Sequence, residues 1–305
     1  MHTNNKISKC KRSQSGIYLK LWQCSIIRIQ ENCPLNYFSV ISVAFLNRDF
    51  TVKKYNELLD AFKKAGYNFQ TVEDFVLSPL PKVVILRHDV DLNEKAALRL
   101  AKNEKSWDIK ATYYFRKRKE DFNIKIIKKI AYLGHEIGYH YEDLSSAKGN
   151  YEIAIQTFLN NLNKLRKVYP VKTICMHGRS GSPYDNRDLW IKYNYKDYGI
   201  ICEPYLDFDF NMILYLTDTV RCWNGNKYSL RDKVQTNYNF YFKTTNNIIE
   251  HINDLPDKIL ITTHPEHWTN NLLEWILIKL FEFIHIIYKK YYRNKVVKRN
   301  AVKEI

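Results

Sequence analysis

The sequence predicts an α/β fold built on a parallel sheet, and three observations support this prediction. From residue 82 onward, short apolar runs typical of buried strands alternate with amphipathic helical segments. About six or seven such units can be counted, a number that suits a barrel. Polar residues directly follow several of the strands, where a barrel gathers its functional groups. The length of 305 residues accommodates one large domain of this kind.

The elements follow from periodicity and from the residues that end them. In the first helix Tyr55, Leu58, Leu59 and Phe62 recur at helical spacing, and Gly66 ends it. The predicted helices cover 51–65, 93–107, 124–133, 151–169, 248–253 and 272–292. The predicted strands cover 83–86, 112–115, 135–139, 173–176, 198–202, 212–216 and 259–263. Asn224-Gly225 also predicts a hairpin over 223–230.

Basic residues are concentrated at the two ends of the chain. The net charge is +16, but residues 1–50 hold seven basic and two acidic residues, and residues 286–305 hold seven basic and one acidic. The middle is therefore only mildly basic. No helix-turn-helix, zinc-finger or RNP-like pattern accompanies it, so no nucleic-acid partner is expected. We predict an irregular extension over 1–46, one domain over 47–295 and a basic tail over 296–305.

The cysteines and the apolar stretches bear on location. Six cysteines without a CxxC pair indicate free thiols in a reducing compartment. No convincing signal peptide begins the chain. Residues 272–288 are apolar but contain Glu274, Lys279 and Glu282, which predicts a terminal helix and not a membrane span. We expect a cytoplasmic protein whose basic C-terminal end contacts the inner membrane surface.

Four predicted strands end in residues that could form a reactive site. Asp89 and Asp91 follow one strand, and His140, His177 and His264 follow three others. Core packing does not require this placement, whereas catalytic groups of a βα barrel collect at the carboxyl ends of its strands. The alternation of a strand points Asp89 and Asp91 to the same side. Two carboxylates so close cannot both ionise cheaply unless a cation or a hydrogen bond intervenes, which suits one carboxylate on a metal and the other as a base. The alternative is that Asp91 belongs to a turn or caps a helix.

Three segments resemble the polysaccharide deacetylase (NodB-homology) superfamily, and more closely its RHDVD-type branch among bacterial capsule and surface-glycan proteins. These segments are Leu86–Asp91 (LRHDVD), Gly134–His140 (GHEIGYH) and Ile261–Trp268 (ITTHPEHW). The resemblance covers about residues 48 to 295. It implies a distorted (β/α)₇ barrel and metal-dependent hydrolysis of an N- or O-linked acetyl group on a sugar.

The resemblance also implies roles for individual residues. Asp89 matches the general base, His264 the general acid, and Arg179 an arginine that steadies the base. Asp91 and His140 match metal ligands. Asp218 and Trp223 lie where the family lines its groove, and Tyr141 and Trp268 are aromatic residues near the mouth that could stack on a sugar. We therefore expect an acetylated saccharide as the substrate.

One ligand position departs from the family pattern. The resemblance places a second ligand histidine four residues after His140, and this position is Leu144. A zinc site with only Asp91 and His140 lacks its third protein ligand. His177 is our first choice to complete it, because it also follows a strand, with Glu142 or Asp143 as alternatives. The expected metal is zinc, with cobalt or nickel as alternatives.

Two other functions remain open on the sequence. A chain that keeps the barrel with an incomplete metal site would be a glycan-binding or scaffold protein without catalysis. Asp89-Val90-Asp91 is also a DxD sequence, which in glycosyltransferases holds a divalent metal against a nucleotide diphosphate. That alternative leaves His140, His177 and His264 without a role.

Overall fold

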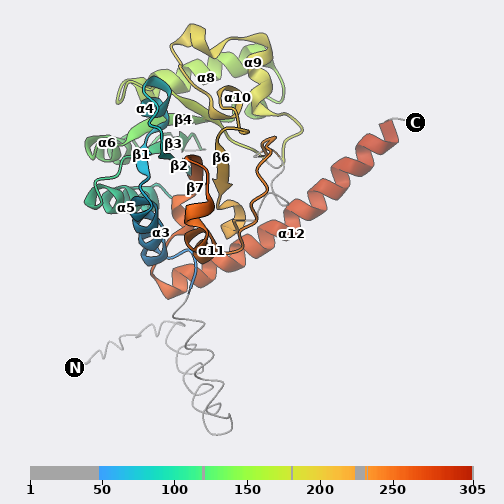
Figure 1. The fold of residues 1–305 in the computed structure, drawn as a ribbon. Helices are drawn as coiled ribbons and strands as arrows, with labels where there is room; N and C mark the ends of the chain where they lie inside the picture. Colours follow the sequence, from blue (N-terminus) through green and yellow to red (C-terminus); the bar gives the residue numbers. More distant parts are fainter. Residues whose placement is uncertain (1–47, 119–120, 180, 224–230, 232, 304–305) are drawn as a thin grey trace, which may run out of the picture. The chain divides into compact units, whose positions relative to one another are not determined.

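The fold is centred on a seven-stranded parallel sheet, which confirms the predicted α/β class (Figure 1). The computed structural model describes residues 48–303 apart from 119–120, 180, 224–230 and 232, with side chains up to residue 287. The strands are β1 (Asn68–Gln70), β2 (Val83–Val90), β3 (Thr112–Arg116), β4 (Glu136–Tyr141), β5 (Ile174–Met176), β6 (Leu214–Thr217) and β7 (Lys258–Thr263). Nearly all their residues are buried, as expected where both faces of a parallel sheet are covered.

The strand order shows an open version of the (β/α)₇ barrel. The strands pair in the order β5-β4-β3-β2-β7-β6, and β1 pairs with the first half of β2. An isolated parallel bridge between Thr173 and Cys202 extends the sheet beside β5. Because every pairing is parallel, the carboxyl ends of β2, β4, β5 and β7 share one edge.

The helices are α3 (Val52–Lys64), α4 (Val72–Leu77), α5 (Glu94–Ser106), α6 (Ile124–Tyr132), α7 (Asp143–Ser146), α8 (Tyr151–Arg166), α9 (Leu189–Lys192), α10 (Pro204–Asp207), α11 (Thr245–Glu250) and α12 (Leu272–Lys303). Side-chain caps define where several begin. The side chains of Thr51, Asn93, Asn123 and Asn150 each accept a hydrogen bond from a backbone N–H in the first turn of α3, α5, α6 and α8.

A buried carboxylate ties α5 to the sheet. Glu104 is fully buried and accepts hydrogen bonds from the hydroxyls of Tyr55, at 2.5 Å, and Tyr113, at 2.7 Å. His88 Nε2 lies 2.7 Å from its Oε1. Burial alone would raise the pKa of Glu104, but the neighbouring His88 outweighs it and lowers the pKa. His88, from the LRHDVD segment, therefore has a structural partner and does not reach the candidate site.

The structure departs from the predicted elements in a few places. No strand forms over the predicted 198–202: a short 3₁₀ helix, Tyr195–Tyr198, ends at Gly199 in a left-handed conformation, and only Cys202 makes a bridge. The sequence prediction missed β1, α4, α7, α9 and α10, whose few residues give no sustained periodicity. Helix α12 runs past the predicted end, to Lys303. The predicted hairpin beyond residue 223 lies outside the described residues.

The predicted extension over residues 1–46 also lies outside the described residues. The compact unit of the described chain spans Asp49–Ile305. Within the described residues, every helix is either too short or too polar to cross a bilayer.

Candidate active site

The predicted residues at the strand ends line one cavity of about 250 Å³. Asp89 belongs to the end of β2 and Asp91 follows it directly. His140 lies in β4, His177 follows β5, and His264 follows β7. Neighbouring parallel strands bring these residues to the same edge of the sheet, as the sequence predicts.

Asp91 lies between two histidine rings. Its Oδ1 is 3.4 Å from His140 Nε2, and its Oδ2 is 3.5 Å from His177 Nε2. Both distances exceed a good hydrogen bond. They match the separation of about 3.3 Å between two ligand atoms that each sit about 2.0 Å from a tetrahedral zinc. Asp91 Oδ1 is also buried without a hydrogen-bond partner. These two contacts make Asp91, His140 and His177 candidate ligands of a divalent cation, but among the described residues only another group, Asp218, His264 and His267, places one ligand atom of each member within 4.8 Å of the others.

Each of the two rings is oriented through its other nitrogen. His140 Nδ1 lies 2.9 Å from the carbonyl oxygen of Cys175, and His177 Nδ1 lies 2.9 Å from Glu142 Oε2. Arg116 in turn donates to Glu142 Oε2 at 2.8 Å. These bonds fix the rings so that both Nε2 atoms face Asp91, the arrangement found behind metal-bound histidines. Glu142, an alternative ligand in the sequence prediction, instead lies behind His177 and orients its ring.

The protonation of the site follows from burial and charge. Burial lowers the pKa of His140, which leaves its ring neutral. Burial would also lower the pKa of His177, but Asp91 and then Glu142 outweigh it and raise the pKa to about 9. Burial would raise the pKa of Asp91, yet His177, His140 and His264 hold it well below its usual range. The carboxylate is therefore ionised, as a metal ligand must be.

Leu144 and Asp143 do not contribute ligands in this structure. Leu144 is 1% exposed and packs in the main hydrophobic core. Asp143 is buried and accepts hydrogen bonds from the hydroxyl of Tyr139 and the amide of Asn161. Burial raises the pKa of Asp143 to about 7. Of the three residues considered for the third ligand, His177 is the one that lies beside both Asp91 and His140.

Arg87, which sequence reasoning missed, holds Asp89. Its Nε and Nη2 donate to Asp89 Oδ1 and Oδ2 at 2.8 and 2.7 Å, and its guanidinium lies over the ring of Tyr205. Burial would raise the pKa of Asp89, but Arg87 outweighs it and lowers the pKa. The two residues are separated by one position on β2, and this alternation was the signal available in the sequence. Arg179 lines the cavity with an exposed side chain, and its assignment beside the base stays a prediction.

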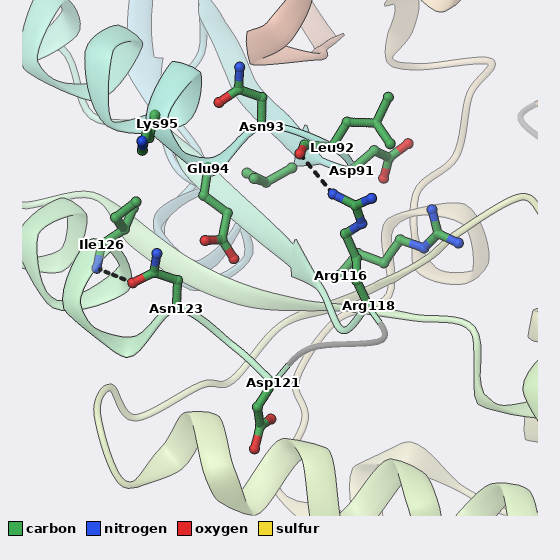
Figure 2. A pocket seen from close by; sticks show the side chains of 11 residues that line it. Asp91, Leu92, Asn93, Glu94, Lys95, Arg116, Arg118, Asp121, Asn123 and Ile126 are labelled. Carbon is green, nitrogen blue, oxygen red and sulfur yellow. Dashed lines mark hydrogen bonds between the residues drawn. The ribbon is translucent and has the colours of Figure 1, made fainter. Parts of the chain in front are cut away.

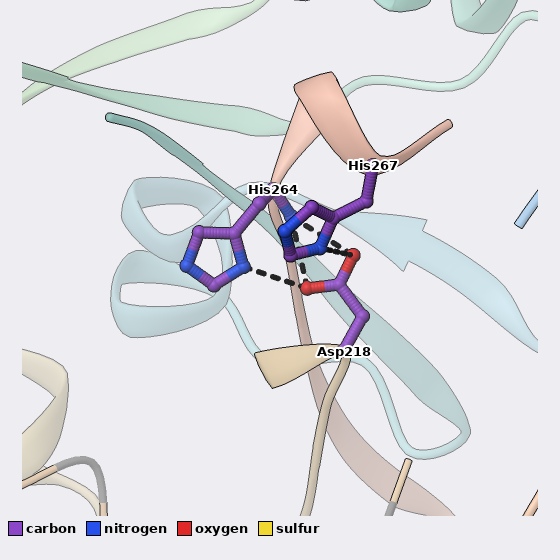
Figure 3. Close-up of side chains that lie close together, drawn as sticks. All are labelled: Asp218, His264 and His267. Atoms are coloured by element: carbon purple, nitrogen blue, oxygen red, sulfur yellow. Dashed lines mark hydrogen bonds and ion pairs between the residues drawn. The ribbon is translucent and has the colours of Figure 1, made fainter. Parts of the chain in front are cut away.

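A second group joins His264 to Asp218 and His267 (Figure 3). Asp218 Oδ1 is 2.6 Å from His264 Nδ1, and Oδ2 is 3.2 Å from His267 Nδ1. Asp218 also accepts from the backbone N–H of His264 and from Trp268 Nε1. One ligand atom from each of the three residues lies within 4.8 Å of the others, so they form a candidate cation group. A separation of 2.6 Å is a charged hydrogen bond, too short for two ligands of one metal.

The hydrogen bond to Asp218 orients His264 toward the cavity. His264 Nε2 lies 3.9 Å from Asp91 Oδ2. Burial alone would lower the pKa of His264, but Asp218 outweighs it and raises the pKa well above its usual range. The ring therefore carries a proton at neutral pH, and its Nε2 faces the part of the cavity that Asp89 and Asp91 line.

The four predicted substrate-binding side chains are buried, which speaks against direct contact with a sugar. Asp218 and Trp268 are fully buried and bonded to one another, and Tyr141 is fully buried with its hydroxyl accepting from Trp190 Nε1. Trp223 is 5% exposed and donates to Thr245. We assign them to packing and orientation, because a side chain without exposed surface does not stack on a ligand.

An adjoining cavity of about 520 Å³ extends the site along β2, β3 and α6 (Figure 2). It shares Asp91 and Arg116 with the first cavity. Arg118 crosses it and donates to the carbonyl oxygen of Leu92 at 3.0 Å.

The comparisons with known proteins give remote similarity only. No family model and no curated protein matches the sequence. Three solved structures of similar arrangement are a CE4 family pseudoenzyme from Bacillus anthracis, a peptidoglycan N-acetylglucosamine deacetylase with a bound benzamide compound, and a family 4 acetyl xylan esterase from Clostridium thermocellum with a cobalt ion. Their identities to this chain are 15%, 18% and 15%, and their TM-scores are 0.39, 0.38 and 0.35.

The alignments cover 69%, 68% and 67% of this chain and 62%, 82% and 84% of the respective structures. The chain thus spans less than two thirds of the first structure's length. The first is described as a pseudoenzyme of the CE4 family, and the other two as a deacetylase and an acetyl xylan esterase. At this level of similarity, no residue role can be transferred from these structures, one of which is a pseudoenzyme. The function of this chain must be inferred from its own side chains.

Proposed function

We propose that the chain is a metal-dependent hydrolase that removes an acetyl group, N- or O-linked, from a sugar of a bacterial surface polysaccharide or its precursor. One observation carries the proposal. The unpartnered carboxylate oxygen of Asp91 and the Nε2 atoms of His140 and His177 converge at a cavity that also holds a carboxylate, Asp89, and a protonated imidazole, His264.

The residues divide the chemistry between them. A divalent metal held by Asp91, His140 and His177 would polarise the acetyl carbonyl and lower the pKa of a bound water. Asp89, kept ionised and oriented by Arg87, accepts a proton from the attacking water. His264, kept protonated by Asp218, donates a proton to the departing amine or alkoxide of the sugar.

The test is acetate release from acetylated chitooligosaccharide and acetylated xylan by the zinc- or cobalt-loaded protein. We expect activity in the wild type and in Asp197→Asn, an exposed carboxylate away from the cavity. Asp89→Asn should lose at least about a hundredfold in rate, the lower range for removing a general base. Equal activity in Asp89→Asn and the wild type would remove Asp89 from the proposed role.

Metal binding is tested separately by elemental analysis of His140→Ala. We expect this variant to lose the metal, and His251→Ala, at an exposed histidine, to retain it. Metal retained by His140→Ala would exclude the proposed ligand set, whatever the activity.

A second candidate is a glycan-binding protein without catalysis. Two observations favour it: Leu144 occupies the family's second ligand position, and the lowered pKa of Asp89 makes its carboxylate a weaker base. Saturable binding of the same oligosaccharides without acetate release would support this candidate. The glycosyltransferase alternative has less support, because Arg87 binds both carboxylate oxygens of Asp89 and leaves Asp91 alone to face a cation.

A further inference from the structure

Helix α12 carries a row of exposed apolar side chains, which we call the apolar stripe. It consists of Leu273, Leu277, Leu280, Ile284 and Ile287, which are 67%, 57%, 56%, 65% and 53% exposed. Steps of four and three residues place all five on one face of the helix. Soluble proteins rarely leave a continuous apolar row of this length in water, so the stripe indicates a binding surface.

The opposite face of α12 is already fixed to the domain. Trp275 Nε1 donates to the carbonyl oxygen of Asp49 at 2.7 Å, and Arg221 Nη1 donates to the carbonyl oxygen of Trp275 at 2.9 Å. About two turns further on, buried Glu282 Oε1 lies 3.4 Å from His267 Nε2. These contacts hold the helix in register, so the stripe faces away from the domain.

The charge of the same helix points to one kind of partner. Beyond the stripe, α12 continues without a break to Lys303 (Figure 1). Residues 286–305 hold seven basic residues and one acidic residue. An apolar face followed by a cluster of basic residues is the pattern of helices that lie in the headgroup region of an anionic bilayer. A second copy paired through parallel stripes would instead bring two basic ends together, which opposes that pairing.

We propose that α12 binds the surface of a membrane containing anionic lipids, with the apolar stripe at the boundary between headgroups and acyl chains. The basic end of the helix binds the lipid phosphates. Phe281, Glu282 and His285 of α12 also line the cavity that holds Asp91 and His264. Membrane binding therefore brings the cavity close to the lipid surface, where membrane-linked saccharides are presented. This last consequence alone rests on the proposed function.

The experiment is cosedimentation of the full-length protein with vesicles of phosphatidylcholine alone or with about one third phosphatidylglycerol. We expect binding to the anionic vesicles only, weakening as salt is raised. Leu277→Glu/Ile284→Glu should weaken binding at least about tenfold, since it adds two repelled charges to the stripe. Ile191→Glu/Met212→Glu is the matched control, because both residues are exposed and apolar but lie outside α12, and it should bind like the wild type.

A second variant tests the charge without altering the stripe. Lys289→Gln/Lys290→Gln/Arg293→Gln/Lys295→Gln should weaken binding to anionic vesicles by about a hundredfold or more. No binding of the wild type to the anionic vesicles, or equal binding of the wild type and both variants, overturns the proposal. If the wild type forms a dimer but does not bind vesicles, and only the stripe variant is monomeric, the stripe is instead the interface with a second copy of the chain. Acetate release from soluble oligosaccharides is a separate readout and would persist in the stripe variant, so the two proposals can fail independently.

Discussion

The affinity of the candidate metal site should rise steeply with pH because of His177. Asp91 and Glu142 outweigh the effect of burial and raise its pKa to about 9, against about 6.5 for an ordinary histidine. A cation requires the unprotonated ring, so below about pH 9 it must displace a proton. Each unit of falling pH then weakens binding about tenfold. Between about pH 8 and about pH 6.5 we expect a loss of roughly thirtyfold, where an ordinary histidine ligand would cause only about twofold.

The assay is a competition titration of the metal-free protein with zinc and a chromophoric chelator, corrected for the chelator's own protonation. Glu142→Gln removes one charge that raises the pKa of His177, so its dependence on pH should be shallower. His251→Ala is the control, since this exposed histidine contacts Asp254 and Phe242 and does not line the cavity, and it should follow the wild type.

Two results would refute the reasoning. A change in the zinc affinity of the wild type of about twofold or less between the two pH values would mean that zinc does not displace a proton from His177. The full dependence retained in His177→Ala would assign the displaced proton to another group.

Three further predictions concern neighbouring residues. Arg87→Gln should lower the free energy of unfolding by about 3–5 kcal/mol at neutral pH, because Asp89 is left buried without its partner. Chemical denaturation measures this free energy, and a loss below about 1 kcal/mol would contradict the prediction. Leu144→His should not raise zinc affinity, because this side chain does not line the cavity, and a gain in affinity by competition titration would contradict this. The same variant should destabilise the fold by about 2 kcal/mol or more, because it buries a polar ring in the hydrophobic core. Asp218→Asn should move the alkaline limb of the pH–rate profile to lower pH, because His264 loses the neighbouring charge that raises its pKa and is deprotonated at lower pH. An unshifted limb would exclude a role for Asp218 in keeping His264 protonated.

The sheet was predictable from the sequence because of how parallel strands are buried. Both faces of β2 and β7 are covered, and each strand contains an apolar run, Val83–Leu86 in β2 and Ile259–Ile261 in β7. Periodicity fails where an element is short or lies at an edge. The segment after Tyr198 has the apolar residues of a strand, but Gly199 adopts a left-handed conformation and only Cys202 makes a bridge. The three residues of β1 are too few to produce a pattern.

The position of the site was predictable, but the burial of its surroundings was not. Strand ends can be located in a sequence, and so Asp91, His140, His177 and His264 could be placed together. Whether Trp268 faces solvent depends on how a distant helix and loop pack over it. Its ring lies against Phe50 and Tyr55, more than 200 residues earlier in the chain, and its indole N–H is used by Asp218. The spacing of residues along the sequence does not predict such long-range contacts.

The position of His177 beside His140 follows from the register of β4 and β5. His140 pairs with Cys175, so the chain that leaves β5 brings His177 alongside the carboxyl end of β4, where its N–H donates to the carbonyl oxygen of Tyr141 at 2.8 Å. A histidine four residues after His140 would depend only on local helical geometry. His177 depends instead on the pairing of a three-residue edge strand. The candidate metal site is thereby coupled to the edge of the sheet, and changes that loosen β5 should weaken metal binding before they disturb Asp89 and Arg87 on the central strand β2.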